Sequence, residues 1–253
     1  MINPPALFCF QLVLLFAVAL STPTTASAAN ATIAVAANFA EPAKALAREF
    51  NASRDSNSHT QIVVGSSGKI FAQISHGAPY HGFLSADQAR VDALVKTDLA
   101  IPASRFTYAI GRLALWVPGM KPDVSSVAEV KRISIANPRF APYGKAAQQI
   151  LDGLDLQPPP QLITGENVAQ AYHFVHSGNA EAGFVALSQV IGKDSEIWLV
   201  PEHLHEPVLQ DAVLIKSANT AAAATALAFF DYLKSPAAEL VLNQFGYKPG
   251  TTL

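Results

Sequence analysis

The stretch IVVGSSGKIFAQI, residues 62–74, shows the local pattern that decides the fold. An apolar, β-branched run ends at four small residues, Gly65 to Gly68, and a segment with the apolar spacing of a helix begins at Lys69. The pattern predicts a strand that passes directly into a helix. Because the first N–H groups of a helix have no partner within it, such a turn is suited to hold an anion with backbone donors and two serine hydroxyls.

Strand-like runs alternate with helix-like segments along most of the chain. Residues 32–37 precede a helical pattern at 41–50, in which apolar residues recur at i, i+3, i+4 and i+7. Further strands are expected at 61–66, 82–86, 112–118, 132–138, 161–165, 182–187 and 211–216, and further helices at 69–77, 85–96, 142–154, 166–178, 220–234 and 235–246. Ser85 and Gln88 have capping-box spacing, and Ser235 is expected to cap the last helix. The alternation predicts an α/β protein with largely parallel sheets.

The composition restricts function and compartment. The chain has 253 residues with 17 basic and 19 acidic side chains and a formal charge of −2, so no general attraction to nucleic acid or to an anionic membrane is expected. Residues 1–29 combine an apolar stretch with a small-residue cleavage motif, which predicts a signal peptide and export. The single cysteine, Cys9, lies in this segment, so the mature chain is expected to have no disulfide and no thiol chemistry.

Four predicted strand-to-helix turns are rich in small or hydrogen-bonding residues: 36–42, 65–69, 137–145 and 164–170. In open α/β sheets, ligands collect at the carboxyl ends of strands, where these turns lie. Each turn taken alone is explained by helix capping and glycine conformation. The four together predict a cage of neutral donors for a compact, fully ionised oxyanion.

The chain also carries the motifs VAANFAEPAKALAREF (35–50), GSSGKIFAQISHGAP (65–79), FLSAD (83–87), NPRFAPYGKAAQQIL (137–151), GENVAQA (165–171) and GYKPG (246–250). In this combination, from about Ala31 to its end, it resembles the periplasmic molybdate-binding proteins that serve an ABC importer. The resemblance implies a two-lobed, type II periplasmic-binding-protein fold with a mixed, mainly parallel sheet in each lobe. It further implies a monomeric, cofactor-free periplasmic protein, not an enzyme, that binds molybdate or tungstate and delivers it to the importer's membrane subunits.

The same resemblance implies four ligand-binding residues. They are Asn38 (side chain and N–H), Ser67 (hydroxyl and N–H), Tyr143 (N–H) and Val168 (N–H), with Ser66 as a neighbouring helix cap. We expect no metal cation at this site, because the metal is bound as part of the molybdate or tungstate oxyanion.

Three positions depart from the pattern of the family. Asn38 replaces a common serine, and Ala186 stands where many members have a tyrosine whose hydroxyl reaches the ligand. The hydroxyl of Tyr143 is a candidate to replace that contact. His81 stands where the family usually has aspartate, and a structural role is expected for it.

The division into lobes follows from the resemblance and from the run at 211–216, which needs a sheet to join. One lobe is expected to comprise residues 30–108 and 212–253, and the other residues 109–211. The chain would cross between them near 108–111 and 210–212.

Alternative chemistry stays open at this point. Ser66 and Lys69 fit the S-x-x-K motif of Ser–Lys acyl-transfer enzymes, although the companion S-D-N and K-T-G motifs are missing. Four histidines at 173, 176, 203 and 205 raise the question of a metal site, but without cysteine or a suitably spaced carboxylate, packing or surface roles are favoured. A third alternative keeps the binding fold and changes the ligand to sulfate, another anion or a small organic acid.

Overall fold

The computed structural model describes residues 30–54, 58–154 and 156–250. The expected signal peptide, residues 1–29, lies outside these ranges. Within them, no helix combines the length and the apolar character that a membrane span needs.

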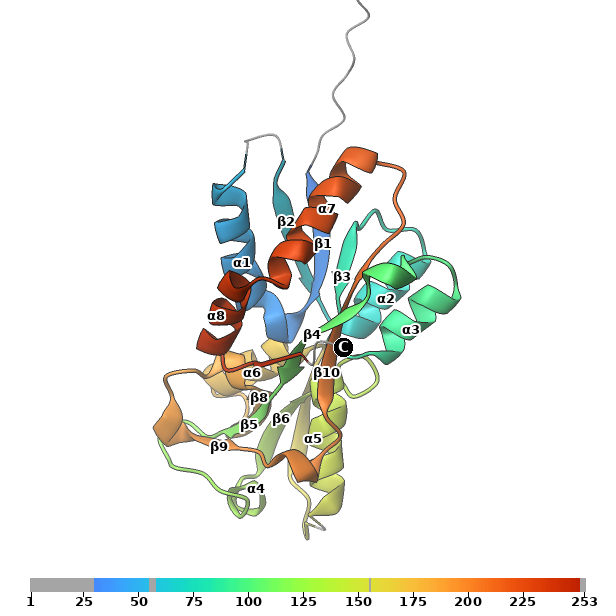
Figure 1. Ribbon diagram of the computed structural model, residues 1–253. Coiled ribbons are helices and arrows are strands. Elements are labelled where there is room, and N and C mark those ends of the chain that lie inside the picture. The colour runs from blue at the N-terminus through green and yellow to red at the C-terminus, as the bar shows by residue number, and fades with distance from the viewer. Residues whose placement is uncertain (1–29, 55–57, 155, 251–253) are drawn as a thin grey trace, which may run out of the picture.

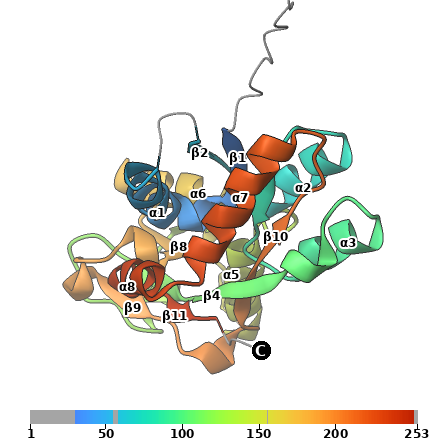
Figure 2. The ribbon, with the colours of Figure 1, turned by 45° about the horizontal axis from the view of Figure 1, so that its top comes forward.

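One half of the molecule, which we call the six-strand lobe, is built on a sheet of order β11-β4-β10-β3-β1-β2. Its strands are β1 (Ala31–Ala36), β2 (Thr60–Gly65), β3 (Gly82–Leu84), β4 (Phe106–Gly111), β10 (Val208–Leu214) and β11 (Lys248–Pro249). Its helices are α1 (Ala40–Ala52), α2 (Ser67–Ser75), α3 (Ala89–Lys96), α7 (Thr220–Leu233) and α8 (Pro236–Gln244). Figure 2 shows α7 in front of β1, with α1 on one side of it and α2 and α3 on the other.

The other half, the five-strand lobe, is built on a sheet of order β7-β6-β8-β5-β9. Its strands are β5 (Leu113–Trp116), β6 (Arg132–Ala136), β7 (Gln161–Gly165), β8 (Ala182–Ala186) and β9 (Ile197–Leu199). Its helices are α4 (Ser126–Glu129), α5 (Pro142–Gly153) and α6 (Val168–His176). Short 3-10 helices occur at Ala37–Phe39, Pro102–Ser104, Leu187–Gln189, Asp194–Glu196 and Glu202–Leu204.

The central strands of each sheet are buried on both faces, as their nearly continuous apolar sequences require, whereas the edge strands β2 and β7 are partly exposed. In β1, Ile33 and Val35 pack in the core that contains α1, α7 and α8, whereas Ala34 packs in the core that contains α2 and α3. In β5, Leu113 packs in the core that contains α5, whereas Trp116 packs with Val175 of α6. Alternation along a strand therefore fills two cores in each lobe.

The sheets are mixed, as expected, and the parallel part of each consists of three strands. Strands β2, β1 and β3 pair in parallel, and so do β7, β6 and β8. In chain order, the first two strands of each set of three are β1 and β2 in one sheet, and β6 and β7 in the other. Each of these strands leads into a helix, and the two helices of a sheet start at the same edge of that sheet. The remaining strands join through antiparallel pairs.

The two lobes meet where β4 and β10 lie side by side (Figure 1). These strands pair from Val208 with Gly111 to Ala212 with Phe106, with a register shift between Gln210 and Asp211. They therefore carry the chain past the junction as an adjacent pair.

Several predicted helix boundaries agree with the structure. The Ser66 hydroxyl caps α2 and the Ser235 hydroxyl caps α8. Gly77, after the end of α2, has φ +85°, a conformation that favours glycine. The capping box expected from Ser85 and Gln88 is wrong: α3 begins at Ala89, and a carboxylate oxygen of Asp87 accepts from the N–H of Arg90 at 3.0 Å instead.

Candidate functional site

The four predicted turns meet around one small cavity between the lobes. The cavity is small: the free space among its lining residues is about 200 Å³ when the open solvent at its mouth is counted. It is lined by Ala36, Ala37, Asn38, Ser66, Ser67, Ala86, Ala141, Pro142, Tyr143, Asn167 and Val168. The structure thus brings together all four residues that the sequence predicts as ligand-binding, two from each lobe.

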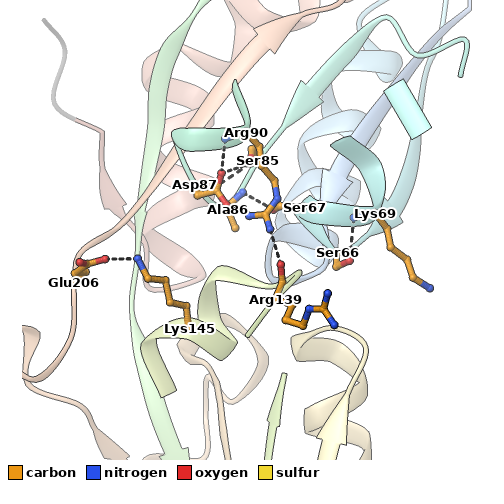
Figure 3. A network of polar contacts seen from close by, with 10 residues as sticks. All are labelled: Ser66, Ser67, Lys69, Ser85, Ala86, Asp87, Arg90, Arg139, Lys145 and Glu206. Carbon is orange, nitrogen blue, oxygen red and sulfur yellow. Dashed lines mark hydrogen bonds and ion pairs between the residues drawn. The ribbon is translucent and has the colours of Figure 1, made fainter. Parts of the chain in front are cut away.

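Ser67 is the side chain at this cavity that is best prepared to donate to an anion. It is the first residue of α2 and 1% exposed. Its hydroxyl oxygen accepts from the N–H of Ala86 at 2.9 Å (Figure 3). Since this bond occupies one lone pair of the oxygen, it orients the hydroxyl while leaving its hydrogen free to donate. The anchoring role of Ala86, which comes from its backbone, is not visible in the sequence.

The other lobe contributes the starts of two helices. Tyr143 is the second residue of α5 and Val168 is the first residue of α6, so neither N–H has a partner within its helix. The Asn167 side chain accepts from the next two N–H groups, those of Ala169 at 3.0 Å and Gln170 at 3.1 Å. The cap therefore satisfies the N–H groups beyond Val168 and leaves the N–H of Val168 to a ligand.

The Asn38 side chain is placed differently from the expectation. Its amide nitrogen donates to the Gln210 side-chain oxygen at 2.7 Å and to the Tyr247 hydroxyl at 3.1 Å. Its backbone carbonyl oxygen accepts from the hydroxyls of Tyr247 at 2.8 Å and Ser188 at 2.9 Å. Both amide hydrogens are thus used inside the protein, and the backbone N–H is the donor that Asn38 retains for a ligand.

The Tyr143 hydroxyl does not replace the tyrosine hydroxyl that many family members have at the position of Ala186. It is buried and makes no hydrogen bond of normal geometry among the described residues, although the Tyr247 hydroxyl and the Asn38 side chain are close enough to shift its pKa. It lies beside Gly111, where a Cβ atom would be 2.3 Å from it, and Gly111 is not part of the cavity lining. Burial raises the pKa of the Tyr143 hydroxyl well above its usual value and that of Tyr247 to about 12, so both stay protonated.

The two other departures from the family pattern are structural. Ala186 ends β8 with its side chain in the apolar core, and its N–H donates to the Gln189 side chain at 3.0 Å. His81 accepts from the N–H of Thr32 at 3.1 Å, close to the start of β1 and thus at the end away from the cavity. The structural role expected for His81 matches this contact.

The electrostatics of the cavity are those of neutral dipoles. The described residues that line it include no Asp, Glu, His, Lys or Arg. A larger groove shares Ala86 and Pro142 with the cavity, and its charged side chains are paired: Arg90 with Asp87, and Lys145 with Glu206 at 2.6 Å (Figure 3). An anion in the cavity would therefore be held by N–H and O–H dipoles rather than by a counter-charge.

The alternative chemistries find no support in this geometry. Ser66 acts as a helix cap, and the Lys69 ammonium extends away from it to pair with Glu166 at 2.7 Å. His176 stacks on Tyr172, with ring centroids 5.8 Å apart. In the part of the chain that the structure describes, no three His, Cys, Asp or Glu side chains come together to hold a metal ion.

The family model described as "Bacterial extracellular solute-binding protein" matches residues 31–248. The chain belongs to the bacterial extracellular solute-binding proteins. It is therefore a transport component that binds a solute and not an enzyme, as the sequence predicts.

Two relatives of this solute-binding protein are named "Molybdate-binding protein ModA". The protein of Rhodobacter capsulatus is 42% identical over 230 residues, covering 88% of this chain and 89% of its own. That of Azotobacter vinelandii is 43% identical over 234 residues, covering 88% and 91%. The solved structure of the periplasmic molybdate-binding protein of Azotobacter vinelandii superposes with a TM-score of 0.78 at 35% identity, covering 86% of this chain and 98% of its own. The predicted resemblance and the two-lobed fold class are confirmed.

Proposed function

We propose that this protein binds molybdate or tungstate in the cavity between its lobes and delivers it to an ABC importer. The observation that carries the proposal is the cavity itself, in which helix starts from both lobes and one oriented serine hydroxyl converge, and in which the described lining residues include no charged side chain. The names of the ModA relatives, which cover most of this chain, support the same ligand.

In this proposal each site residue has a defined role. Ser67 donates with its hydroxyl and its N–H, and Asn38, Tyr143 and Val168 donate with their backbone N–H groups. A helix start favours negative charge through the helix dipole, so three such starts offset much of the cost of removing a dianion from water. Asn38 acts with its backbone because its side chain is committed to Gln210 and Tyr247.

The same set of donors predicts selectivity against phosphate. At neutral pH phosphate still carries a proton, which needs an acceptor, and the described lining residues offer no carboxylate. Molybdate, tungstate and sulfate are fully ionised and need donors only. Sulfate is the smaller ion, so it would leave some of the fixed donors of the two lobes out of reach.

We further propose residues 30–108 with 212–253 as one lobe and residues 109–211 as the other. The pairing of β4 with β10 at the junction supports crossings near 108–111 and 210–212. An anion that touches Asn38 and Ser67 on one side and Tyr143 and Val168 on the other would favour the closed arrangement, because only there are all contacts made. The protein would act as a monomer in the periplasm after removal of residues 1–29.

Calorimetry tests the proposal directly. The mature chain from Asn30, stripped of carried-over ligand by denaturing dialysis, is titrated with molybdate, tungstate, sulfate and phosphate. The expected result is tight one-to-one binding of molybdate and tungstate and no heat with phosphate. If sulfate binds more tightly than molybdate, sulfate is the ligand of the same site. No heat with any of the four anions would contradict an oxyanion site altogether.

A further inference from the structure

The loop between β6 and α5, residues 137–141, is held by two donors from the six-strand lobe. The N–H of Gly68 donates to the carbonyl oxygen of Phe140 at 2.9 Å. The guanidinium group of Arg90 donates to the carbonyl oxygen of Arg139 at 3.2 Å (Figure 3). Neither donor belongs to the set that we assign to the anion, yet both join the lobes directly beside the cavity.

We propose that Gly68 and Arg90 are positioning residues for anion binding. They donate hydrogen bonds to the two carbonyl groups of the loop. These bonds hold the start of α5, and with it the N–H of Tyr143, in position to contact the anion. The inference rests on the proposed function, because it assigns to these two residues part of the affinity for the oxyanion.

The loop is held in one conformation by its own hydrogen bonds, so a contact at its carbonyl groups also affects the start of α5. The carbonyl oxygen of Asn137 accepts from the N–H groups of Phe140 at 3.1 Å and Ala141 at 2.9 Å, and its side-chain oxygen accepts from the N–H of Arg139 at 3.0 Å. Ala141 directly precedes α5. A donor that holds the carbonyl groups of this loop therefore also sets the position of Tyr143, two residues further on.

Gly68 is suited to this contact because it has no side chain. A Cβ atom at this position would lie 3.0 Å from the Nη2 atom of Arg90 and from the Cα atom of Phe140, and 3.1 Å from the carbonyl oxygen of Phe140, closer than ordinary van der Waals contact. The two Phe140 atoms are backbone atoms of the opposite lobe, so relief of the contact requires a small shift of the loop as well as of the Arg90 guanidinium group, and both shifts disturb the same contact between the lobes. Gly68 itself lies in α2, where alanine is the better helix former. Local structure thus favours alanine, and the contact between the lobes favours glycine.

Arg90 is oriented by the segment that also orients Ser67. The Asp87 carboxylate accepts from the N–H of Arg90 and pairs with its guanidinium group. The residue before Asp87 is Ala86, whose N–H holds the Ser67 hydroxyl. One short segment therefore fixes an anion donor on one side and the loop of the opposite lobe on the other.

The first test compares Gly68→Ala with Gly153→Ala. Gly153 is also a helical glycine, at the end of α5, and a Cβ atom there meets nothing within 4 Å. We expect Gly68→Ala to weaken molybdate affinity in calorimetry by about tenfold, the scale of typical coupling between sites. Thermal unfolding of the ligand-free variant should be unchanged or shifted upward, a combination that a loss of structure would not produce. Gly153→Ala should bind as the wild type does. Wild-type affinity in Gly68→Ala would overturn the proposal.

The second test compares Arg90→Gln with Arg139→Gln. Each variant removes one positive charge beside the groove, but only Arg90 uses its side chain as a donor to the loop, whereas Arg139 contributes its backbone carbonyl. We expect weaker molybdate binding in Arg90→Gln and wild-type binding in Arg139→Gln. Equal losses in the two variants would mean that charge alone acts and would overturn the role of Arg90.

The outcomes separate this inference from the proposed function. If the wild-type protein binds molybdate and Gly68→Ala and Arg90→Gln bind equally well, the positioning role is wrong and the ligand assignment stands. If the wild-type protein binds none of the four anions, both are wrong.

Discussion

Replacement of Ser67 by alanine is the sharpest test of the cavity, because its hydroxyl has two separable tasks. Its oxygen accepts from the N–H of Ala86 at 2.9 Å, in a position that is 1% exposed. Its hydrogen is assigned to the anion. The variant Ser67→Ala removes both interactions, and each is measured by a different experiment.

The two magnitudes follow from the two hydrogen bonds that the variant removes. Without the hydroxyl, the N–H of Ala86 is left buried and unpaired, which lowers the free energy of unfolding of the ligand-free protein by about 1–3 kcal/mol. Removal of the hydrogen bond to a charged ligand costs about 1.5–3 kcal/mol of binding free energy, which corresponds to about a 10- to 150-fold weaker affinity. Urea denaturation measures the first effect and calorimetry with molybdate measures the second.

The neighbouring serine provides the control. Ser66 accepts from the N–H of Lys69 at 3.4 Å as the cap of α2, so Ser66→Ala should lower the free energy of unfolding by about 1 kcal/mol and leave molybdate affinity unchanged. If the two variants lose affinity equally, or if Ser67→Ala loses none, the assignment of the Ser67 hydroxyl to the anion would be refuted.

Three further predictions concern residues around the site. Burial lowers the pKa of His81 below 6.5, so the unfolded chain takes up a proton at higher pH than the folded chain does. The free energy of unfolding should therefore fall as the pH drops below about 6.5. The variant His81→Asn should remove this part of the pH dependence in urea denaturation. Tyr143→Phe removes a buried hydroxyl that makes no hydrogen bond of normal geometry among the described residues, so it should raise the free energy of unfolding by about 1 kcal/mol in the same assay while molybdate affinity is retained. Lys69 and Glu166 form an ion pair across the lobes, with side chains that are 52% and 45% exposed. A double-mutant cycle with Lys69→Met and Glu166→Gln should therefore give a coupling free energy below about 1 kcal/mol in molybdate binding. This coupling free energy should decrease in high salt.

The sequence predicts which turns gather around the cavity, because each turn is a local feature. A β-branched run followed by small residues and a helical period specifies a strand-to-helix turn, as at Gly65 to Lys69, without information from elsewhere in the chain. Once the sheets are parallel at these strands, the turns must gather at one edge. Asn38, Ser67, Tyr143 and Val168 therefore lie together as expected.

The directions of the side chains were beyond local reasoning. The Asn38 amide is held by Gln210, which lies 172 residues further along the chain, and by Tyr247, which lies 209 residues further. Neither partner carries a local signal of this role, since a glutamine in a strand and a tyrosine near the end of the chain are ordinary residues in a sequence. The Tyr143 hydroxyl is directed toward Gly111 by the same kind of long-range packing.

Gly68 illustrates a signal that was present but ambiguous. A glycine in the second position of a helix, directly after a capping serine and the first helical residue, is unfavourable for the helix and therefore needs another reason. The reason is the backbone of Phe140 in the opposite lobe, which no local pattern identifies.

The order of strands in the two sheets also determines when each can form during synthesis. All strands of the five-stranded sheet lie between residues 113 and 199, so that sheet is available as one continuous stretch of chain. In the six-stranded sheet, β10 lies between β3 and β4, which leave the ribosome about a hundred residues before it. A growing chain that ends before residue 208 therefore has β3 and β4 without the strand that joins them, and their exposed edges are open to wrong partners. The half of the molecule that begins the chain is the last to be completed.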